Sequence, residues 1–231
     1  MRWLDLPRVP EAEAMDEAEE VSAYASATGE QYLNKLDDTL VDQFIRLGAR
    51  QGPPRGRLLD VGCGPGGIAL KIARRCPSLE VVGVDRASRM VASARAEAAA
   101  GGLGSRAAFS VGDGNSLPFP AASFNYLLSN SVLHHLENPV AVFNEMRRVA
   151  RPGASILIRD LRRPPRLLYP FHIRWHGRYY SGVMKGLYVR SVRAAYTPAE
   201  LAAMLARSKL AGARIFELGG THLGFICQIP G

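Results

Sequence analysis

The sequence predicts an α/β fold in which helices cover both faces of a doubly wound, mostly parallel sheet. Between residues 57 and 160, short apolar runs alternate with segments whose apolar residues recur every three or four positions, as expected for alternating strands and helices. A glycine-rich loop follows the first apolar run and comes directly before a helical pattern. The 231 residues are enough for one large domain, with or without a lid.

The composition indicates an ordinary globular protein with a strong basic excess. Hydrophobic residues make up 47% of the chain, and no apolar run approaches the roughly 20 residues that a membrane-spanning helix needs. The first residues lack the apolar core of a signal peptide and the three cysteines are scattered, so we expect a cytoplasmic protein without a disulfide framework. The net charge of +8 is compatible with nucleic acid, but a locally basic lid explains it more simply.

The glycine loop follows an expected strand at residues 57–61 and opens an expected helix. Gly62, Gly64 and Gly67 satisfy the G-x-G-x-x-G pattern of dinucleotide-binding loops, in which a ligand approaches bare backbone at the positive end of a helix. Asp60 favours a different ligand, because a carboxylate at the end of the strand repels a pyrophosphate and attracts an ammonium group.

The run from Asp60 to Gly66 reads D-x-G-x-G-x-G and resembles motif I of the class I S-adenosylmethionine (SAM)-dependent methyltransferases. The resemblance implies a Rossmann-like sheet of seven strands in the order 3-2-1-4-5-7-6, with strand seven antiparallel. It also implies that SAM is the cofactor and S-adenosylhomocysteine (SAH) the product. The residues that the resemblance places at the amino-acid part of SAM are Asp60, Gly62, Cys63, Gly64 and Gly66.

The second expected strand, residues 80–85, is apolar almost throughout, as a parallel strand buried on both faces should be, and it ends in Asp85. Asp85 follows the last glycine of the loop at about the 20 residues expected of a ribose-binding acid, and its carboxylate can accept both ribose hydroxyls. Ser88 opens the next helix. The resemblance implies that Met90, in the first turn, packs on the adenine or ribose and that Arg86 also contacts the cofactor.

The third expected strand, residues 107–111, leads into the motif G-D-x-x-x-L-P-F at residues 112–119. This motif is similar to that of the methyltransferase group that includes the ubiquinone and menaquinone methyltransferases. The resemblance implies that Asp113 accepts the adenine amino group, for which an acceptor-only carboxylate is suited, and that Gly114 also contacts the cofactor.

The fourth expected strand, residues 124–129, precedes a segment that the family places at the methyl-transfer edge. The resemblance implies that Asn130 and Ser131 contact the methionine part of SAM. His134 and His135 follow, and an imidazole beside the methyl donor can take a proton from the acceptor. Both are candidate general bases, His135 ahead of His134, against the alternative that they only position the loop. A base is not obligatory, because the sulfonium already activates the methyl group.

Two further helix starts and three strands complete the expected domain. Asn138 and Pro139 give a capping residue followed by proline, and Thr197 and Glu200 have the spacing of a capping box. The remaining expected strands are residues 155–160, 213–218 and 223–229. The last two form a terminal hairpin, which is typical of the family.

Residues 161–196 interrupt the α/β alternation, and we expect them to form a lid over the acceptor. Eight basic residues alternate with aromatic residues in this segment. Such a mixture can bind RNA, bind a flat or anionic small molecule, or simply cover the core. His172 and His176 have the i, i+4 spacing of metal ligands on a helix, but no third ligand is evident, so we expect no metal site.

Residues 1–50 are expected to form a helical cover on a SAM-binding domain of residues 51–231. Apolar residues recur every three or four positions between residues 33 and 47, which predicts one apolar helix face. In related methyltransferases the N-terminal helices often cover the SAM pocket. Tyr24 and Tyr32 therefore either face the cofactor or simply pack.

The predicted function is transfer of the sulfonium methyl of SAM to an O, N or C nucleophile of a small-molecule acceptor. Two alternatives stay open, a non-catalytic SAM-binding partner protein and an NAD-type oxidoreductase. Asp60 and the terminal hairpin count against the oxidoreductase. We expect no nucleic-acid partner, and the sequence leaves the acceptor and the oligomeric state open.

Overall fold

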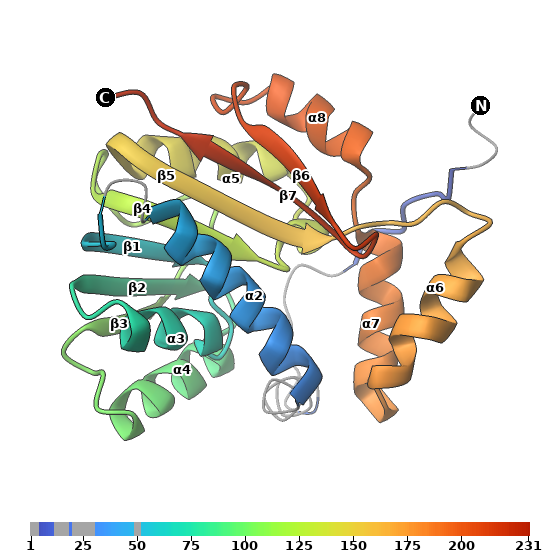
Figure 1. The fold of residues 1–231 in the computed structure, drawn as a ribbon, viewed down its shortest axis with the longest axis horizontal. Helices are drawn as coiled ribbons and strands as arrows, with labels where there is room; N and C mark the ends of the chain where they lie inside the picture. Colours follow the sequence, from blue (N-terminus) through green and yellow to red (C-terminus); the bar gives the residue numbers. More distant parts are fainter. Residues whose placement is uncertain (1–4, 12–18, 20–30, 49–51) are drawn as a thin grey trace.

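The computed structural model describes residues 5–11, 19, 31–48 and 52–231. At its centre is one sheet, formed by β1 (Gly56–Val61), β2 (Leu79–Asp85), β3 (Ala107–Val111), β4 (Phe124–Asn130), β5 (Ala150–Leu161), β6 (Arg214–Leu218) and β7 (His222–Gln228). The seven strands follow the order β3-β2-β1-β4-β5-β7-β6, drawn in Figure 1. This order confirms the predicted topology.

The sheet is parallel except at its C-terminal strand. β1 pairs in parallel with β2 and β4, β2 with β3, and β4 with β5. β7 lies antiparallel to both β5 and β6, as predicted. The carboxyl ends of β1 to β5 therefore meet at one edge of the sheet, which is where open α/β sheets bind their ligands.

Helices cover both faces of the sheet, and each face has its own apolar core (Figure 1). The helices on these faces are α2 (Gln31–Gly48), α3 (Gly67–Arg75), α4 (Ser88–Ala100), α5 (Pro139–Val149) and α8 (Pro198–Ala206). Leu40, Phe44 and Ile72 are fully buried where α2 and α3 pack, and Phe143 and Leu201 are fully buried under α5 and α8. The fold is thus doubly wound, as expected.

The predicted caps fix the starts of α5 and α8. The Asn138 side chain accepts a hydrogen bond from the Ala141 N–H at 3.3 Å. Thr197 and Glu200 form a reciprocal capping box, in which each side chain accepts from the main-chain N–H of the other residue. Such bonds satisfy N–H groups that the first turn of a helix leaves without an intrahelical partner.

The fifth strand is longer than predicted. It begins at Ala150 rather than near Ser155, because Ala150 already pairs with Phe124 before an irregularity shifts the register. Arg151 to Gly153 form the irregular start of the strand, where Gly153 has a φ of +77°. Glycine tolerates this left-handed conformation, which explains why the turn-like composition does not interrupt the strand.

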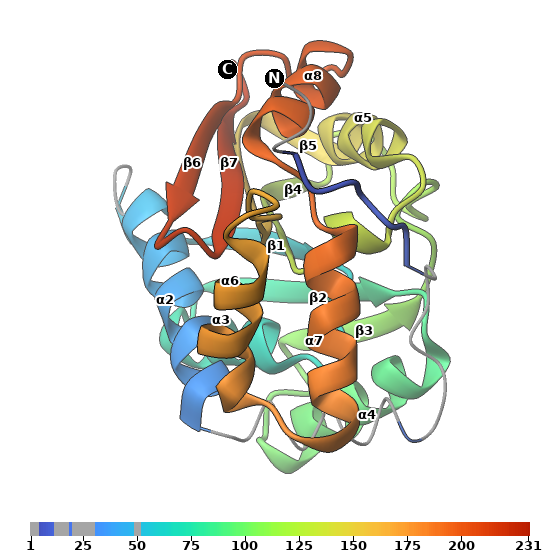
Figure 2. The ribbon, with the colours of Figure 1, turned by 90° about the vertical axis from the view of Figure 1, so that its right-hand side faces the viewer.

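Residues 161–196, called the insertion below, contain α6 (Tyr169–His176), the short 3-10 helix η3 (Gly177–Tyr179) and α7 (Gly182–Ala194). Figures 1 and 2 show α6 and α7 side by side, beyond the ends of the parallel strands. Leu187 and Val192 are buried, so α7 packs inward. None of the helices in the described part of the chain has the length and apolar character needed to cross a membrane.

The start of the chain is tied to the insertion. The Val9 N–H donates to the Arg193 carbonyl at 3.1 Å, and Arg8 Nε donates to the Ala194 carbonyl at 2.6 Å. Arg8 also donates from Nη2 to the carbonyl of His134 at 2.9 Å, in the 3-10 helix η2 (Leu133–His135). Residues 5–11 therefore connect the insertion with the loop after β4.

Candidate active site

A cavity of ≈ 210 Å³ opens at the edge where the parallel strands end. The glycine loop after β1 and the residues that follow β2, β3 and β4 form one side of it, and α2 and α7 form the other. The predicted site residues that line the cavity are Gly62, Gly64, Asp85, Arg86, Met90, Asp113, Gly114, Asn130, Ser131, His134 and His135. The fold thus brings most of the predicted site into one place.

The glycine loop presents backbone rather than side chains to the cavity. Gly62 has a φ of +75°, and a Cβ added there would overlap the side chain of Val132. Its N–H and that of Cys63 both donate to the Val84 carbonyl, at 2.7 and 3.1 Å, which holds the loop against β2. Glycine is needed here for two reasons, the left-handed conformation and the close approach of Val132.

Asp85 stands at the end of β2 with its carboxylate held by main-chain donors. Oδ2 accepts from the Gly64 N–H at 2.8 Å, and Oδ1 accepts from the Ala87 N–H at 2.9 Å. These two bonds connect the glycine loop to the start of α4 and fix the orientation of the carboxylate. Its position at the end of the strand agrees with the one predicted.

Asp113 and Gly114 follow the neighbouring strand β3. The Asp113 Oδ1 atom accepts from the main-chain and side-chain nitrogens of Asn115, at 2.8 and 2.9 Å. A Cβ on Gly114 would lie 3.3 Å from a methyl group of Val61, so a glycine keeps this wall close to β1. Met90, which is buried in α4, also reaches the cavity.

Three predicted contacts lie behind the cavity wall rather than in it. Asp60 is buried, and burial raises its pKa to about 7, with further contributions from the negative charges of Asp85 and Asp37. Cys63 is buried as well, and burial raises the pKa of its thiol. Gly66 faces the core, where a Cβ would lie 3.0 Å from Ala94. Asp60 can therefore influence a ligand through its charge.

The two predicted tyrosines cannot be placed. Tyr24 lies outside the described residues, and for Tyr32 the structure describes the backbone of α2 but not the side chain.

Asp37 of α2 lines the cavity and was not predicted from the sequence. Burial raises its pKa to about 6, while the charges of Lys71 and Arg159 act in the opposite direction. In the sequence it stands next to Leu36, at the border of the apolar face of this helix. An acid at that border is the signal that could have identified it.

Arg159 of β5 is a second residue that sequence reasoning missed. It is buried to 2% exposure, and its Nε donates to Asn130 Oδ1 at 2.8 Å. Its Nη1 donates to Thr39 Oγ1 at 2.8 Å, which ties α2 to the sheet. Ser131, whose N–H donates to the Arg159 carbonyl, has a φ of +57°. A non-glycine residue in this conformation is uncommon and is found disproportionately at functional sites.

His134 is paired with a buried carboxylate. Its Nδ1 lies 2.6 Å from Asp160 Oδ1, and its main-chain N–H donates to Asp160 Oδ2 at 3.3 Å. Burial alone would raise the pKa of Asp160, but the charge and hydrogen bond of His134 lower it below its usual value. The contact at Nδ1 fixes the ring orientation and leaves Nε2 as the nitrogen that can serve the cavity.

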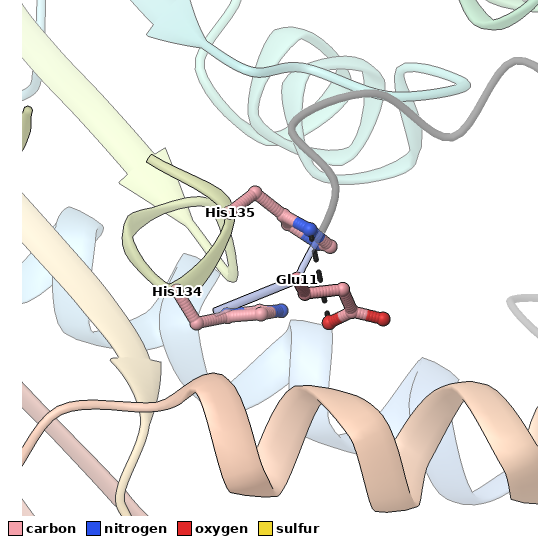
Figure 3. A group of neighbouring side chains, drawn as sticks. All are labelled: Glu11, His134 and His135. Carbon is pink, nitrogen blue, oxygen red and sulfur yellow. Dashed lines mark ion pairs between the residues drawn. The ribbon is translucent and has the colours of Figure 1, made fainter. Parts of the chain in front are cut away.

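His135 faces Glu11 from the N-terminal segment, as Figure 3 shows. His135 Nδ1 lies 3.9 Å from Glu11 Oε2, and the same carboxylate accepts from Ser191 Oγ at 3.0 Å and from Arg190 Nε at 3.5 Å. Potential ligand atoms of Glu11, His134 and His135 lie within 4.8 Å of one another. The group therefore has metal-like spacing, which the sequence did not reveal because Glu11 is far away along the chain.

The other histidine pair stands in the insertion. His172 and His176 lie on one face of α6 with their rings 4.8 Å apart, and His172 Nε2 lies 3.1 Å from the Tyr188 hydroxyl. Burial lowers the pKa of His172 to about 4. In the described ranges, no acid or cysteine joins this pair as a possible metal ligand. Its contact with Tyr188 connects α6 to α7.

Comparisons with known proteins find methyltransferases. A family model described as a methyltransferase domain matches residues 59–158. A demethylmenaquinone methyltransferase of Thermus thermophilus is 31% identical over 160 residues, which are 65% of this chain and 72% of that protein. The ajmaline N-methyltransferase of Rauvolfia serpentina is 39% identical over 101 residues, which are 44% of this chain and 34% of that protein.

A solved structure supports the fold independently. The crystal structure of a SAM-dependent methyltransferase from Aquifex aeolicus matches with a TM-score of 0.60 and 21% identity, over 84% of this chain and 89% of that one. The matched part of this chain spans only 34% to 48% of the length of five of the curated relatives.

Proposed function

Because the chain belongs to the class I SAM-dependent methyltransferases, we propose that it transfers a methyl group from SAM to an O, N or C nucleophile of a small-molecule acceptor. When bound, SAM supplies a methyl group activated by a sulfonium, and the transfer leaves SAH. The residues of the chain then have to hold SAM, align the acceptor and exclude water, and remove a proton where the acceptor carries one.

The observation that carries the proposal is the placement of Asp85 and Asp113 on one cavity. Asp85 ends β2 and Asp113 follows the adjacent strand β3, and the bare backbone of the glycine loop also lines the cavity. We assign Asp85 to the ribose hydroxyls and Asp113 to the adenine amino group, because both partners donate hydrogen bonds and a carboxylate only accepts. Gly62 and Gly64 would border the amino-acid part, and Met90 would pack against the nucleoside.

Negative charge near the glycine loop suits a cationic cofactor. Asp37 lines the cavity and Asp60 lies directly behind it, so their ionised forms favour the sulfonium and ammonium groups of SAM. The same charges would oppose the pyrophosphate of NAD. Together with the antiparallel β7 and the family membership, this sets the oxidoreductase alternative aside.

We assign His134 as the proton acceptor ahead of His135, which reverses the order predicted from the sequence. The contact between Nδ1 and Asp160 orients the imidazole and fixes its tautomer, which is a role of the acid in carboxylate–histidine catalytic pairs. His135 has a looser partner in Glu11, at 3.9 Å.

The group of Glu11, His134 and His135 supports proton handling better than metal binding. The guanidinium of Arg190 lies 3.5 Å from the Glu11 carboxylate, and that positive charge opposes a divalent cation at the same oxygen atoms. The carboxylate also accepts a hydrogen bond from Ser191. We therefore keep the interpretation without a metal.

We propose that residues 1–50 and the insertion cover the site, with α7 as the wall toward the acceptor. Met184 and Leu187 line the cavity, and so do Tyr180 and Tyr188, whose stacked rings have their centres 4.6 Å apart. These side chains favour an acceptor with apolar or aromatic parts. We also propose a cytoplasmic location, which the three free and buried cysteines support.

The direct test of the proposed activity measures transfer of a labelled methyl group. SAM labelled in its methyl group is incubated with the purified chain and fractionated small-molecule extracts. We expect label to move into an acceptor fraction with the wild type and not with Asp85→Ala. SAM binding without transfer to any fraction would instead favour the non-catalytic alternative.

A further inference from the structure

Exposed apolar side chains are concentrated in the insertion. Of the nine large apolar residues that are exposed in the described part of the chain, six lie between residues 167 and 183. We call these six the α6 patch: Leu167, Leu168, Phe171, Trp175, Tyr179 and Val183. Figure 2 shows α6 at the outside of the molecule, in front of the sheet. A patch of this kind on a folded protein marks a surface that contacts something apolar.

The packing of α6 creates this exposure. His172 and His176 face inward, where His172 contacts Tyr188 of α7. Phe171 and Trp175 stand on the other side of the helix, with 71% and 60% of their surfaces exposed. Leu168, three residues before Phe171, falls on the same side and is 56% exposed. The outward side of α6 therefore carries two large aromatic side chains and a leucine.

The basic excess of the chain is located in the same segment. Residues 161–196 contain eight of the 29 lysines and arginines and no acidic residue, so the remaining 21 basic residues equal the 21 acidic ones. The exposed members include Arg174 and Arg178, and the Arg178 guanidinium lies 4.0 Å from the centre of the Trp175 ring. Positive charge thus surrounds the apolar side chains.

We propose that the α6 patch docks on the surface of an anionic membrane. Phe171, Trp175 and the leucines would enter the boundary between headgroups and acyl chains, and the arginines would contact lipid phosphates. Amphipathic helices with aromatic and leucine residues on one face and arginine around it bind membranes in this way. The helix lies on the membrane and does not cross it.

Charge and side-chain type separate this partner from two others. A second copy of the chain would bring the exposed basic residues Arg166, Arg174, Arg178 and Lys185 against the same four, which opposes pairing through this face. Single-stranded RNA would use the arginines and aromatic rings, but it would leave Leu167, Leu168 and Val183 without a role. Lipid accounts for the aliphatic, aromatic and basic residues together.

The first experiment measures binding of the full chain to vesicles by sedimentation. We expect binding to vesicles of equal parts phosphatidylglycerol and phosphatidylcholine, weaker binding to phosphatidylcholine alone, and loss of the difference at high salt. The proposal does not depend on methyl transfer, so no activity measurement enters the test. Failure of the chain to bind the anionic vesicles would overturn it.

A pair of variants locates the binding surface. Phe171→Ser with Trp175→Ser should lower vesicle affinity at least about tenfold, since each removes a large buried apolar area from the bound state. The matched control changes two exposed apolar residues elsewhere, Val111→Ser with Leu218→Ser, and should change affinity less than about twofold. Equal affinity of the two double variants would contradict the proposal.

Tryptophan fluorescence tests whether Trp175 enters the lipid and distinguishes lipid from the two other partners. Trp175 is one of two tryptophans, so the variant Trp3→Phe leaves it as the single reporter. Its emission should shift to the blue when anionic vesicles are added. An unchanged emission with vesicles, a shift with single-stranded RNA only, or a shift that follows protein concentration without lipid would each overturn the membrane assignment.

Discussion

The Nδ1 atom of His134 lies 2.6 Å from Oδ1 of Asp160, and both side chains are buried beside the cavity. His134 belongs to η2, which follows β4, and Asp160 belongs to the end of the adjacent parallel strand β5. The contact holds the imidazole by one nitrogen. On this geometry we base the prediction that His134, rather than His135, accepts the proton.

Asp160→Asn should therefore reduce turnover without reducing SAM affinity. The amide keeps the size of the carboxylate but can present an N–H group to Nδ1, which would favour the wrong tautomer of the imidazole, so we expect turnover to fall at least about 100-fold. Calorimetric SAM affinity should stay within about twofold. His135→Gln is the matched comparison and should have the smaller effect on turnover. Full turnover by a folded Asp160→Asn variant would show that His134 is not the base.

Gly62→Ala should destabilise the chain more than the same change at Gly220. The two glycines have nearly equal φ values, +75° and +73°, so both substitutions carry the strain of a left-handed alanine, about 1 kcal/mol. Only at Gly62 does the added Cβ also overlap Val132, whereas at Gly220 it meets open space. Urea unfolding should show an additional loss of about 1–3 kcal/mol at Gly62. Equal losses of stability at Gly62 and Gly220 would show that the contact between Gly62 and Val132 is not as close as the structure has it.

Asp60 should make the unliganded chain less stable as the pH rises. Burial raises its pKa from 3.8 to about 7, so the folded state binds a proton that the unfolded state has released between these values. The stability that the protonated Asp60 side chain contributes is therefore fully present below pH 3.8 and is lost as the pH rises through about 7. The free energy of unfolding of Asp60→Asn, relative to that of the wild type, should therefore rise by about 2–4 kcal/mol between pH 5 and pH 8.

Urea unfolding at pH 5 and pH 8, without SAM, measures this difference. The control is Asp38→Asn, at an exposed acid that pairs with Lys71 at 2.9 Å, where we expect changes below about 1 kcal/mol at both pH values. A gain for Asp60→Asn that did not grow with pH would contradict the raised pKa.

SAM affinity should rise with pH between about 5 and 8. Asp37, with its pKa raised to about 6, and Asp60, with its pKa raised to about 7, become ionised over this range and then attract the cationic cofactor. Asp37→Asn should remove the part of the rise near pH 6. SAH, which lacks the sulfonium charge, should show a smaller rise. Calorimetric titrations that gave a flat or falling SAM affinity would refute this role of the two acids.

The fold could be predicted because its signals are local. The strand at residues 107–111 and the caps at Asn138 and Thr197 depend on neighbouring residues, and the structure has them as expected. Asp85 and Asp113 could also be predicted, since each follows a parallel strand and such strands end at one edge. Whether these two acids bind SAM stays a prediction.

The parts of the site that depend on distant contacts could not be predicted. Arg159, which lines the cavity, bonds to Thr39, 120 residues away, and Glu11 bonds to Ser191 across 180 residues. No periodicity or motif encodes such contacts. The contact that leads us to propose His134 ahead of His135 is also tertiary, because Asp160 lies at the end of another strand.

Calorimetric titration of SAM into the wild type and into Asp85→Ala tests the central claim most directly. Asp85 links the glycine loop to α4 through Gly64 and Ala87 and faces the cavity, so we expect one SAM site per wild-type chain and a loss of affinity of at least about tenfold in the variant. Asp38→Ala should bind SAM like the wild type. If the folded wild type binds no SAM, or if Asp85→Ala binds it with unchanged affinity, the account of this site is wrong.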